Sequence, residues 1–283
     1  MLGSQMVKVF LNENFEVFTT SRSILTTKNH FNVDLTNSEE VVSMLNNCNP
    51  SLIIHCAANT NLKNCELNVE QCESLHQSAT KLLVEYKSVK KIVYISTDSV
   101  FDGIRGDFKE TDETNPLNKY ASTKLKGEQI VLESDNVGYV IRTNILGFNN
   151  PIKSSLFEWA YSELKHLRGI NGFKDVVFNP LYTLDLAKLC KQFIDLDLEK
   201  GIYHIASKSS ISKYELLLKI QTEFTNETKL VKPISIDEIT STQSRPKNTI
   251  LNTSKIELLG LNIPSIDETL RHLFLDFKNS DII

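Results

Sequence analysis

Thr97, Tyr120 and Lys124 have the types and the spacing of a proton-transfer site. Tyr120 and Lys124 are four residues apart at the start of a predicted helix, so they lie on one face and the ammonium reaches the region of the phenol. The positive charge favours phenolate, and it is expected to lower the pKa of Tyr120 from its usual value of about 10. Tyr120 would then act as a general acid near neutral pH.

A predicted strand positions the Thr97 hydroxyl. Residues 92–96 are I-V-Y-I-S, an apolar, β-branched run typical of a buried parallel strand, and Thr97 follows its carboxyl end. Each residue also has an ordinary structural interpretation: Thr97 as a cap of the next turn, Tyr120 as a half-buried helix residue and Lys124 as a solvated cation. A Tyr-x-x-x-Lys pair alone is a weak motif, but a hydroxyl at the preceding strand end favours catalysis.

The sequence around these residues predicts an α/β fold. Short apolar strands alternate with amphipathic helices over the first two-thirds of the chain, which predicts a doubly wound parallel sheet covered on both faces. The predicted strands are 16–20, 31–33, 52–56, 92–96, 138–142 and 202–205. The predicted helices are 4–11, 38–46, 69–88, 119–134, 155–167, 184–195, 213–225 and 265–273. The C-terminal elements are expected to form a smaller, discontinuous substrate-binding lobe.

The composition is that of an ordinary globular protein, and it argues against several function classes. With 283 residues, a net charge of −4 and a pI of about 5.9, the chain has no basic field for nucleic acid and no polybasic membrane patch. No apolar run approaches the ~18–20 residues that span a bilayer, and the N-terminus is no secretory signal, so a cytoplasmic location is expected. Reduced thiols, rather than a redox or metal role, are expected for the five cysteines: Cys48, Cys56, Cys65, Cys72 and Cys190.

Two longer strings carry a family resemblance. Y-I-S-T-D-S-V-F-D-G and E-T-D-E-T-N-P-L-N-K-Y-A-S-T-K-L-K-G-E resemble the extended short-chain dehydrogenases/reductases, and most of all the dTDP-4-dehydrorhamnose reductase family of sugar-nucleotide reductases. Segments 53–60, 141–143, 178–187 and 245–255 support the same family. The resemblance implies a Rossmann-type NAD(P)-binding domain from 1–143 and 176–206, and a substrate-binding lobe from 144–175 and 207–283.

The resemblance also implies a reaction. It is the NADPH-dependent reduction of the 4-keto group of a nucleoside-diphosphate 4-keto-6-deoxyhexose, in deoxysugar and polysaccharide biosynthesis. Tyr120 would protonate the forming alkoxide, Thr97 would orient the carbonyl, and Lys124 would bind the nicotinamide ribose besides tuning the phenol. The alternative is a regulatory, partner-binding subunit like the beta subunit of methionine adenosyltransferase, which shares the fold. A homodimer is a further family-level expectation.

The start of the chain departs from the family pattern. The extended reductases open with a strand and a G-x-x-G-x-x-G turn, whose amides hold the cofactor pyrophosphate. Here the first four residues match only the last third of that turn, which assigns Leu2 and Gly3 to cofactor binding. Three explanations stay open: residues precede the given start, the protein is a degenerate relative that holds cofactor poorly, or another element or chain fills the place of the strand.

The resemblance assigns more residues to the cofactor. No acidic residue directly follows the predicted strand 16–20, where the family would bind the ribose of NAD, and Arg22 there suits a 2′-phosphate, so NADP(H) is favoured over NAD(H). Asp34 and Leu35 occupy the adenine-contacting position, although Asp34 is equally suited to start the next helix through turn hydrogen bonds. Three small residues at a strand end let the backbone approach the nicotinamide ribose: Cys56, Ala57 and Ala58.

Five residues are assigned to the nucleotide-sugar substrate: Thr60, Val100, Phe101, Asn179 and Arg245. The first three follow strand ends on the predicted substrate side. Arg245 suits a clamp on the diphosphate, because a guanidinium makes bidentate phosphate contacts; a surface arginine before a Pro-fixed turn is the competing interpretation. Arg142, which ends a buried strand, is expected to form a structural ion pair instead.

Overall fold

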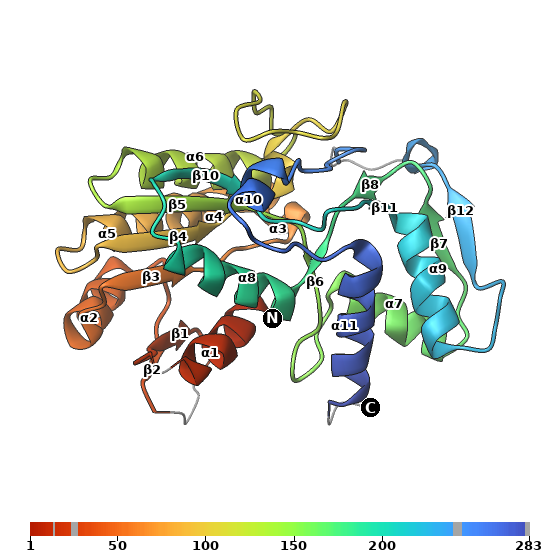
Figure 1. Ribbon diagram of the computed structural model, residues 1–283, viewed down its shortest axis with the longest axis horizontal. Helices are drawn as coiled ribbons and strands as arrows, with labels where there is room; N and C mark the ends of the chain where they lie inside the picture. The colour runs from red at the N-terminus through yellow and green to blue at the C-terminus, as the bar shows by residue number, and fades with distance from the viewer. Residues whose placement is uncertain (14, 24–27, 240–244, 281–283) are drawn as a thin grey trace.

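A parallel sheet with helices on both faces forms the larger part of the molecule, and a smaller lobe packs beside it (Figure 1). The computed structural model describes residues 1–13, 15–23, 28–239 and 245–280. The strands of the larger part are β1 (Thr19–Ser21), β2 (His30–Asn32), β3 (Leu52–His55), β4 (Lys91–Ile95), β5 (Val137–Arg142) and β10 (Gly201–His204). Its helices are α1 (Leu2–Asn12), α2 (Ser38–Cys48), α3 (Leu62–Leu67), α4 (Val69–Glu73), α5 (Ala79–Glu85), α6 (Lys119–Glu133), α8 (Thr183–Asp195) and α10 (Ser254–Leu258).

The smaller lobe is built from short strands and three longer helices in the described residues. Its strands are β6 (Ile145–Leu146), β7 (Ile170–Phe173), β8 (Val177–Phe178), β9 (Leu181–Tyr182), β11 (Ile211–Ser212) and β12 (Val231–Ile234). Its helices are α7 (Leu156–Lys165), α9 (Lys213–Phe224) and α11 (Ile266–Lys278), whose apolar faces share one core. Among the residues that the structure describes, no helix is long and apolar enough to cross a membrane.

The central sheet has the predicted topology. Four parallel strands follow the order β10-β5-β4-β3, and β1 pairs with β2 in a separate parallel pair on the β3 side (Figure 1). Parallel strands with crossing helices are the doubly wound arrangement, so the predicted fold class is confirmed. In the described residues, no strand lies in space between the β1–β2 pair and β3, so the pair and the four-stranded sheet are separate. The carboxyl ends of β3, β4 and β5 meet at one edge, which is where such folds bind their ligands.

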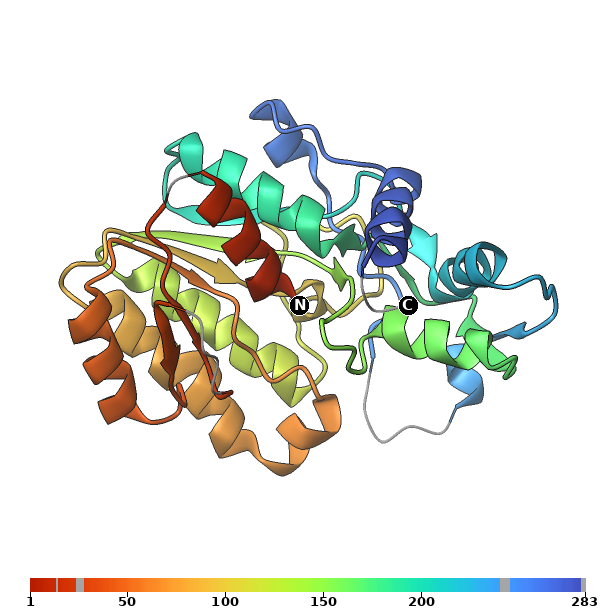
Figure 2. The same ribbon diagram turned by 90° about the horizontal axis from the view of Figure 1, so that it is seen from below.

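Alternate residues of β4 pack into two separate cores. Ile92 and Tyr94 face α2, α5 and α6, whereas Val93 and Ile95 face α1 and α8 on the opposite side of the sheet. All four are at most 6% exposed, because side chains alternate across a strand and both faces are covered. Helices α1 and α8 lie side by side (Figure 2), so the N-terminus of α1 is held close to the carboxyl edge of the sheet.

The predicted helix 69–88 is interrupted. Helix α4 continues into a π-helical turn at Ser74–Ser78 and then into α5. This wide turn packs on α6 and holds His76, which is fully buried. A π-turn is one residue wider than an α-helical turn, and it often marks a functional site. The sequence pattern predicted one continuous helix and did not indicate this turn.

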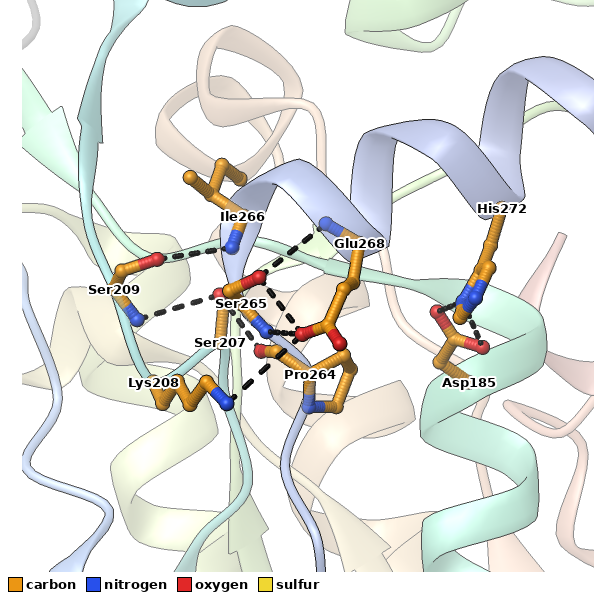
Figure 3. A network of polar contacts seen from close by, with 9 residues as sticks. All are labelled: Asp185, Ser207, Lys208, Ser209, Pro264, Ser265, Ile266, Glu268 and His272. Carbon is orange, nitrogen blue, oxygen red and sulfur yellow. Dashed lines mark hydrogen bonds and ion pairs between the residues drawn. The ribbon is translucent and has the colours of Figure 1, made fainter.

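Helix α11 fastens the smaller lobe to the larger domain. Its first turn has a capping box, and the loop after β10 reaches that turn, where the Ser209 hydroxyl accepts the Ile266 amide at 2.9 Å (Figure 3). Farther along α11, the His272 ring lies 2.9 Å from the Asp185 carboxylate of α8. The lobe is thus held at two successive places along one helix, which keeps it in a defined position beside the sheet.

A buried ion pair fixes α6 against the sheet. Arg142 donates to both carboxylate oxygens of Glu128 at 2.7–3.2 Å, and the two side chains are 3% and 1% exposed. The predicted structural ion pair of Arg142 is therefore confirmed. Ser96, the residue before Thr97, donates to the same carboxylate. Glu128 thus ties α6 to the ends of both β4 and β5.

We expect Glu128→Gln to lower the free energy of unfolding by about 3–5 kcal/mol, because it leaves the Arg142 charge buried without its counter-ion. Urea unfolding monitored by circular dichroism measures the change. The control is Lys219→Gln, which removes a surface ion pair with Asp267 at 2.9 Å and should change stability by no more than about 0.5 kcal/mol. Equal effects of the two substitutions would contradict the role given to Glu128.

Candidate active site

The three residues of the predicted proton-transfer site meet at the carboxyl edge of the central sheet. Thr97 follows β4, while Tyr120 and Lys124 lie on the first turns of α6. The Thr97 hydroxyl lies close enough to the Tyr120 phenol to shift its pKa. Lys124 also lies near Cys56 at the end of β3, close enough for each side chain to shift the pKa of the other. Strand ends and a helix start therefore bring together residues that are far apart in the sequence.

A buried carboxylate holds Thr97 in place. Thr97 Oγ1 donates to Asp98 Oδ1 at 3.1 Å and accepts the Ser99 amide at 3.2 Å, so its predicted capping role is also present. Asn144 and Thr249 donate to Asp98 Oδ2 at 2.6 and 2.5 Å. Asp98 is only 3% exposed, and these bonds occupy both of its oxygens. Since Thr249 comes from the C-terminal part of the chain, Asp98 links the Thr97 turn to the smaller lobe.

The Lys124 side chain is 1% exposed. Its Nζ donates to the Ile95 carbonyl at 2.7 Å and lies 3.8 Å from the centroid of the Tyr94 ring, where it makes a cation–π contact. Burial lowers the pKa of Lys124 to about 7, although the Glu128 carboxylate raises it in part. A lysine that titrates near neutral pH inside a ligand-binding edge is a functional-site candidate.

The predicted fall in the Tyr120 pKa is wrong for this structure. Burial raises the pKa of Tyr120, the nearby Thr97 hydroxyl lowers it, and the negative charge of Asp98 raises it again. The Lys124 ammonium is bound to the Ile95 carbonyl, and removal of the phenol from water outweighs its charge. At neutral pH Tyr120 is therefore a neutral phenol, the form that can donate a proton.

His76 connects a strand-end loop to the helix that carries Tyr120. Its Nε2 accepts the Asn59 amide at 3.0 Å, so Nδ1 bears the proton and donates to Thr123 Oγ1 at 2.8 Å. Thr123 in turn donates to the Tyr120 carbonyl at 2.9 Å. Burial, helped by the charge of Lys124, lowers the pKa of His76 to about 3, so the ring stays neutral and both bonds persist. No motif or spacing in the sequence indicated His76.

Comparison with known proteins identifies the family. The sequence model of the RmlD substrate binding domain matches residues 1–279. The chain belongs to this family. It is similar to dTDP-4-dehydrorhamnose reductase of Aggregatibacter actinomycetemcomitans, 29% identical over 274 residues that cover 90% of this chain and 88% of the relative. Methionine adenosyltransferase 2 subunit beta of Danio rerio is 27% identical over 280 residues, which cover 94% and 84%.

A solved structure supports the same assignment. The dTDP-4-dehydrorhamnose reductase from Bacillus anthracis in complex with NADP is 27% identical, with a TM-score of 0.85 over 97% of this chain and 95% of that one. The predicted resemblance to the sugar-nucleotide reductases of the RmlD family is therefore confirmed.

The N-terminal end of α1 in this RmlD-family chain fits an anionic cofactor group. A Cβ built on Gly3 would meet only the Cβ of Cys56, at 4.0 Å, so the backbone here borders open space. No side chain of the described residues caps this end of α1, and its first amides can therefore bind an anion. The Leu2 side chain packs in the core below, so only its backbone faces this place. Ala57 and Ala58 continue the edge beyond Cys56.

Arg22 and Asp34 lie close together at the ends of β1 and β2. Asp34 accepts the Thr36 amide and hydroxyl at 2.9 and 2.8 Å, and these bonds, together with the charge of Arg22, lower its pKa. Asp34 thus forms the expected turn bonds before α2, while Leu35 packs against the core. The Arg22 side chain is exposed. A cation here fits the ribose-phosphate end of a nicotinamide dinucleotide laid across the strand ends.

Three predicted substrate residues lie in the core instead. Val100 and Phe101 are 0% exposed, and the Phe101 ring stacks on Phe108 at 4.3 Å. Asn179 is 2% exposed, and its amide nitrogen donates to two backbone carbonyls at 2.9 Å. None of these side chains presents surface to a ligand. The prediction that they contact the sugar is corrected: these side chains are part of the buried core.

The other two predicted substrate residues, Thr60 and Arg245, are exposed. Thr60 lies in the loop after β3. Arg245 precedes Pro246, which packs so closely on Gly103 that a Cβ there would lie 2.3 Å from the proline Cβ. Gly103 also has φ +70, so glycine is required at this contact. The contact anchors Arg245 beside the loop that follows the Thr97 turn.

Lys213, the first residue of α9, was not predicted from the sequence. Its Nζ lies 3.2 Å from the centroid of the Phe178 ring, and its charged neighbours are Asp98 and Arg245. Burial lowers the pKa of Lys213 to about 7; Asp98 raises it and Arg245 lowers it. The available signal was a lysine at the first position of a helix, where the helix dipole disfavours a cation.

In the described part of the chain, no His, Cys, Asp or Glu cluster could hold a metal ion.

We expect His76→Leu to leave the Asn59 amide and the Thr123 hydroxyl without partners, at a cost of about 1–3 kcal/mol of unfolding free energy. Hydrogen exchange at the Asn59 amide should become at least about tenfold faster, because its acceptor is gone. Mass-spectrometric exchange measures this rate. His166→Leu, on the exposed end of α7, is the control and should leave it unchanged. Unchanged exchange in the His76 variant would contradict the link.

Proposed function

We propose that this chain is an NADPH-dependent reductase of the 4-keto group of a nucleoside-diphosphate 4-keto-6-deoxyhexose. The observation that carries the proposal is the meeting of Thr97, a neutral Tyr120 and a buried Lys124 at the ligand-binding edge of a doubly wound sheet. Similarity to dTDP-4-dehydrorhamnose reductases over nine-tenths of the chain supports it. The expected location is the cytoplasm, and a homodimer through α6 is part of the same proposal.

Tyr120 donates the proton in this mechanism. The substrate carbonyl accepts hydrogen bonds from Thr97 and Tyr120, which fixes its orientation and polarises it. When bound, the nicotinamide would supply the hydride. The raised pKa keeps Tyr120 protonated until the alkoxide develops, and the phenolate left behind is stabilised by the protonated form of Lys124. Without substrate the single Thr97 proton is donated to Asp98; on binding it would turn to the carbonyl, while the Ser99 amide continues to hold the Thr97 oxygen.

The cofactor would lie along the edge from α1 to α6. The α1 amides at Leu2 and Gly3 suit its pyrophosphate, and the backbone of the small residues after β3 suits the nicotinamide ribose. Arg22 favours NADP(H) over NAD(H), because it offers a cation to the 2′-phosphate. The similar Bacillus anthracis protein was solved with NADP, which supports this preference.

Arg245 and Lys213 are proposed to bind the diphosphate of the substrate. Both lie on the smaller lobe, each influences the other electrostatically, and Lys213 is also near Asp98 beside Thr97. Two neighbouring cations repel each other until an anion lies between them. A diphosphate bound there would leave the sugar pointing toward Thr97 and Tyr120.

The similarity to methionine adenosyltransferase 2 subunit beta favours one second candidate, a regulatory, partner-binding subunit. A partner-binding role does not require a proton donor. Turnover that depends on Tyr120 therefore distinguishes the reductase from the subunit. Copurification with a larger enzyme, without any turnover, would favour the subunit.

We expect Tyr120→Phe to reduce kcat for NADPH-dependent reduction of a dTDP-4-keto-6-deoxyhexose by at least about 100-fold, because the proton donor is lost. The change leaves the ring in place, so NADPH affinity, measured by nucleotide fluorescence, should stay within about twofold. Tyr86→Phe is the control; its hydroxyl binds Asn46 at the surface, at 3.1 Å. Unchanged turnover in the Tyr120 variant would rule out the mechanism.

We expect Lys213→Met to weaken dTDP binding about tenfold, since one phosphate cation is removed. In the wild type, affinity should fall as pH rises above 7, because Lys213, with a pKa of about 7, loses its charge. The variant should lack this component of the pH dependence. Calorimetry between about pH 6 and 9 measures both. Lys219→Met, on the same helix but paired with Asp267, is the matched control; identical pH profiles for wild type and the Lys213 variant would disprove the assignment.

A further inference from the structure

Cys65 and Cys72 lie against each other, a pairing that their spacing in the sequence did not indicate. The Cys72 thiol donates to Cys65 Sγ at 2.7 Å. Bonded sulfurs are about 2.05 Å apart, so a shift of roughly 0.7 Å would bring the pair to bonding distance. Cys65 belongs to α3 and Cys72 to α4, and both are 0% exposed. Two separate helices therefore hold the sulfurs together, not a flexible loop.

We propose that Cys65 and Cys72 are a modification site, at which a small peroxide converts the two thiols into a reversible intramolecular disulfide. One thiolate attacks a peroxide oxygen, which gives a sulfenic acid and one water. The second sulfur then attacks the sulfenic sulfur and releases a second water. The two sulfurs lose two electrons, the peroxide gains them, and both thiol protons leave in the two waters. A dithiol reverses the change.

The surroundings of the pair suit a small oxidant and a slow, pH-dependent reaction. Burial raises the pKa of Cys65, and the adjoining Cys72 and the Glu66 carboxylate raise it further. The thiolate is the reactive form, so cross-linking should accelerate as pH rises. Helices α3 and α4 have six and five residues, and local opening of such short helices admits a peroxide more readily than a bulky disulfide.

The disulfide would change the hydrogen bonds that hold Asn59, in the loop before Thr60. The Cys65 thiol donates to the Asn59 carbonyl at 3.3 Å, and the Asn59 amide group donates to Cys72 Sγ at 3.5 Å. A disulfide has no S–H, so the Asn59 carbonyl loses its donor. The backbone of Asn59 also binds His76, which reaches α6 through Thr123. An effect on reductase turnover would rest on the proposed function; the cross-link itself does not.

The test counts thiols in the full-length chain. Reduced protein is treated with hydrogen peroxide, quenched, unfolded and labelled with N-ethylmaleimide, and its intact mass is measured. The five cysteines should give five labels before oxidation and three after it, with five restored by dithiothreitol. Peptide mapping should join Cys65 to Cys72. The loss of two labels should be faster at pH 9 than at pH 7.

Variants separate this pair from the other cysteines. Cys65→Ser and Cys72→Ser should each keep all four remaining labels after peroxide, whereas a variant with Cys48→Ser and Cys190→Ser should still lose two. If a serine variant fails to fold, the label count and the peptide map of the wild type decide alone. Five labels after oxidation, a cross-link between other cysteines, or over-oxidation of one sulfur without a cross-link would each overturn the proposal.

Discussion

The Glu128 carboxylate is the constraint on which the site depends. Tyr120, Lys124 and Glu128 follow one another at four-residue intervals on α6, so they occupy one face of the helix. Glu128 binds Arg142 of β5 and Ser96, the residue before Thr97, in a place that excludes water. Because a buried carboxylate must keep both partners, α6 can occupy only one position along the sheet. That position brings Tyr120 opposite Thr97.

Asp98 plays the corresponding part between the two lobes. Its oxygens accept Thr97 and Ser99 on one side, and Asn144 and Thr249 on the other. A buried carboxylate is tolerated only when such donors replace water, so the turn after β4, the segment after β5 and the C-terminal segment must come together for the fold to be stable. The same bonds orient the Thr97 hydroxyl. Stability and site geometry therefore depend on one group.

The features that could be predicted from the sequence are those set by hydrophobic periodicity and by the shared edge of parallel strands. The doubly wound sheet, nearly all helices and the meeting of Thr97 with Tyr120 follow from local pattern and from the shared edge of parallel strands. Properties set by tertiary burial were not predictable. Phe101 follows the Thr97 turn as expected, yet its ring points into a core; the pKa of Tyr120 rises because water is excluded. His76 was not predicted, because a single histidine within an expected helix indicates neither its burial nor the π-turn that holds it.

Lys124 and Lys213 differ from the neighbouring carboxylates of Glu128 and Asp98 in one respect. Glu128 and Asp98 are saturated with donors, whereas Lys124 and Lys213 contact aromatic rings and have pKa values of about 7 because burial disfavours their charge. Under the proposed function, anionic ligands beside these lysines would restore the electrostatic stabilisation that burial removes and would raise both pKa values. Ligand binding would then take up protons, and both lysines would be charged when the phosphates are present. The charge needed to stabilise a Tyr120 phenolate would thus be coupled to occupancy of the site.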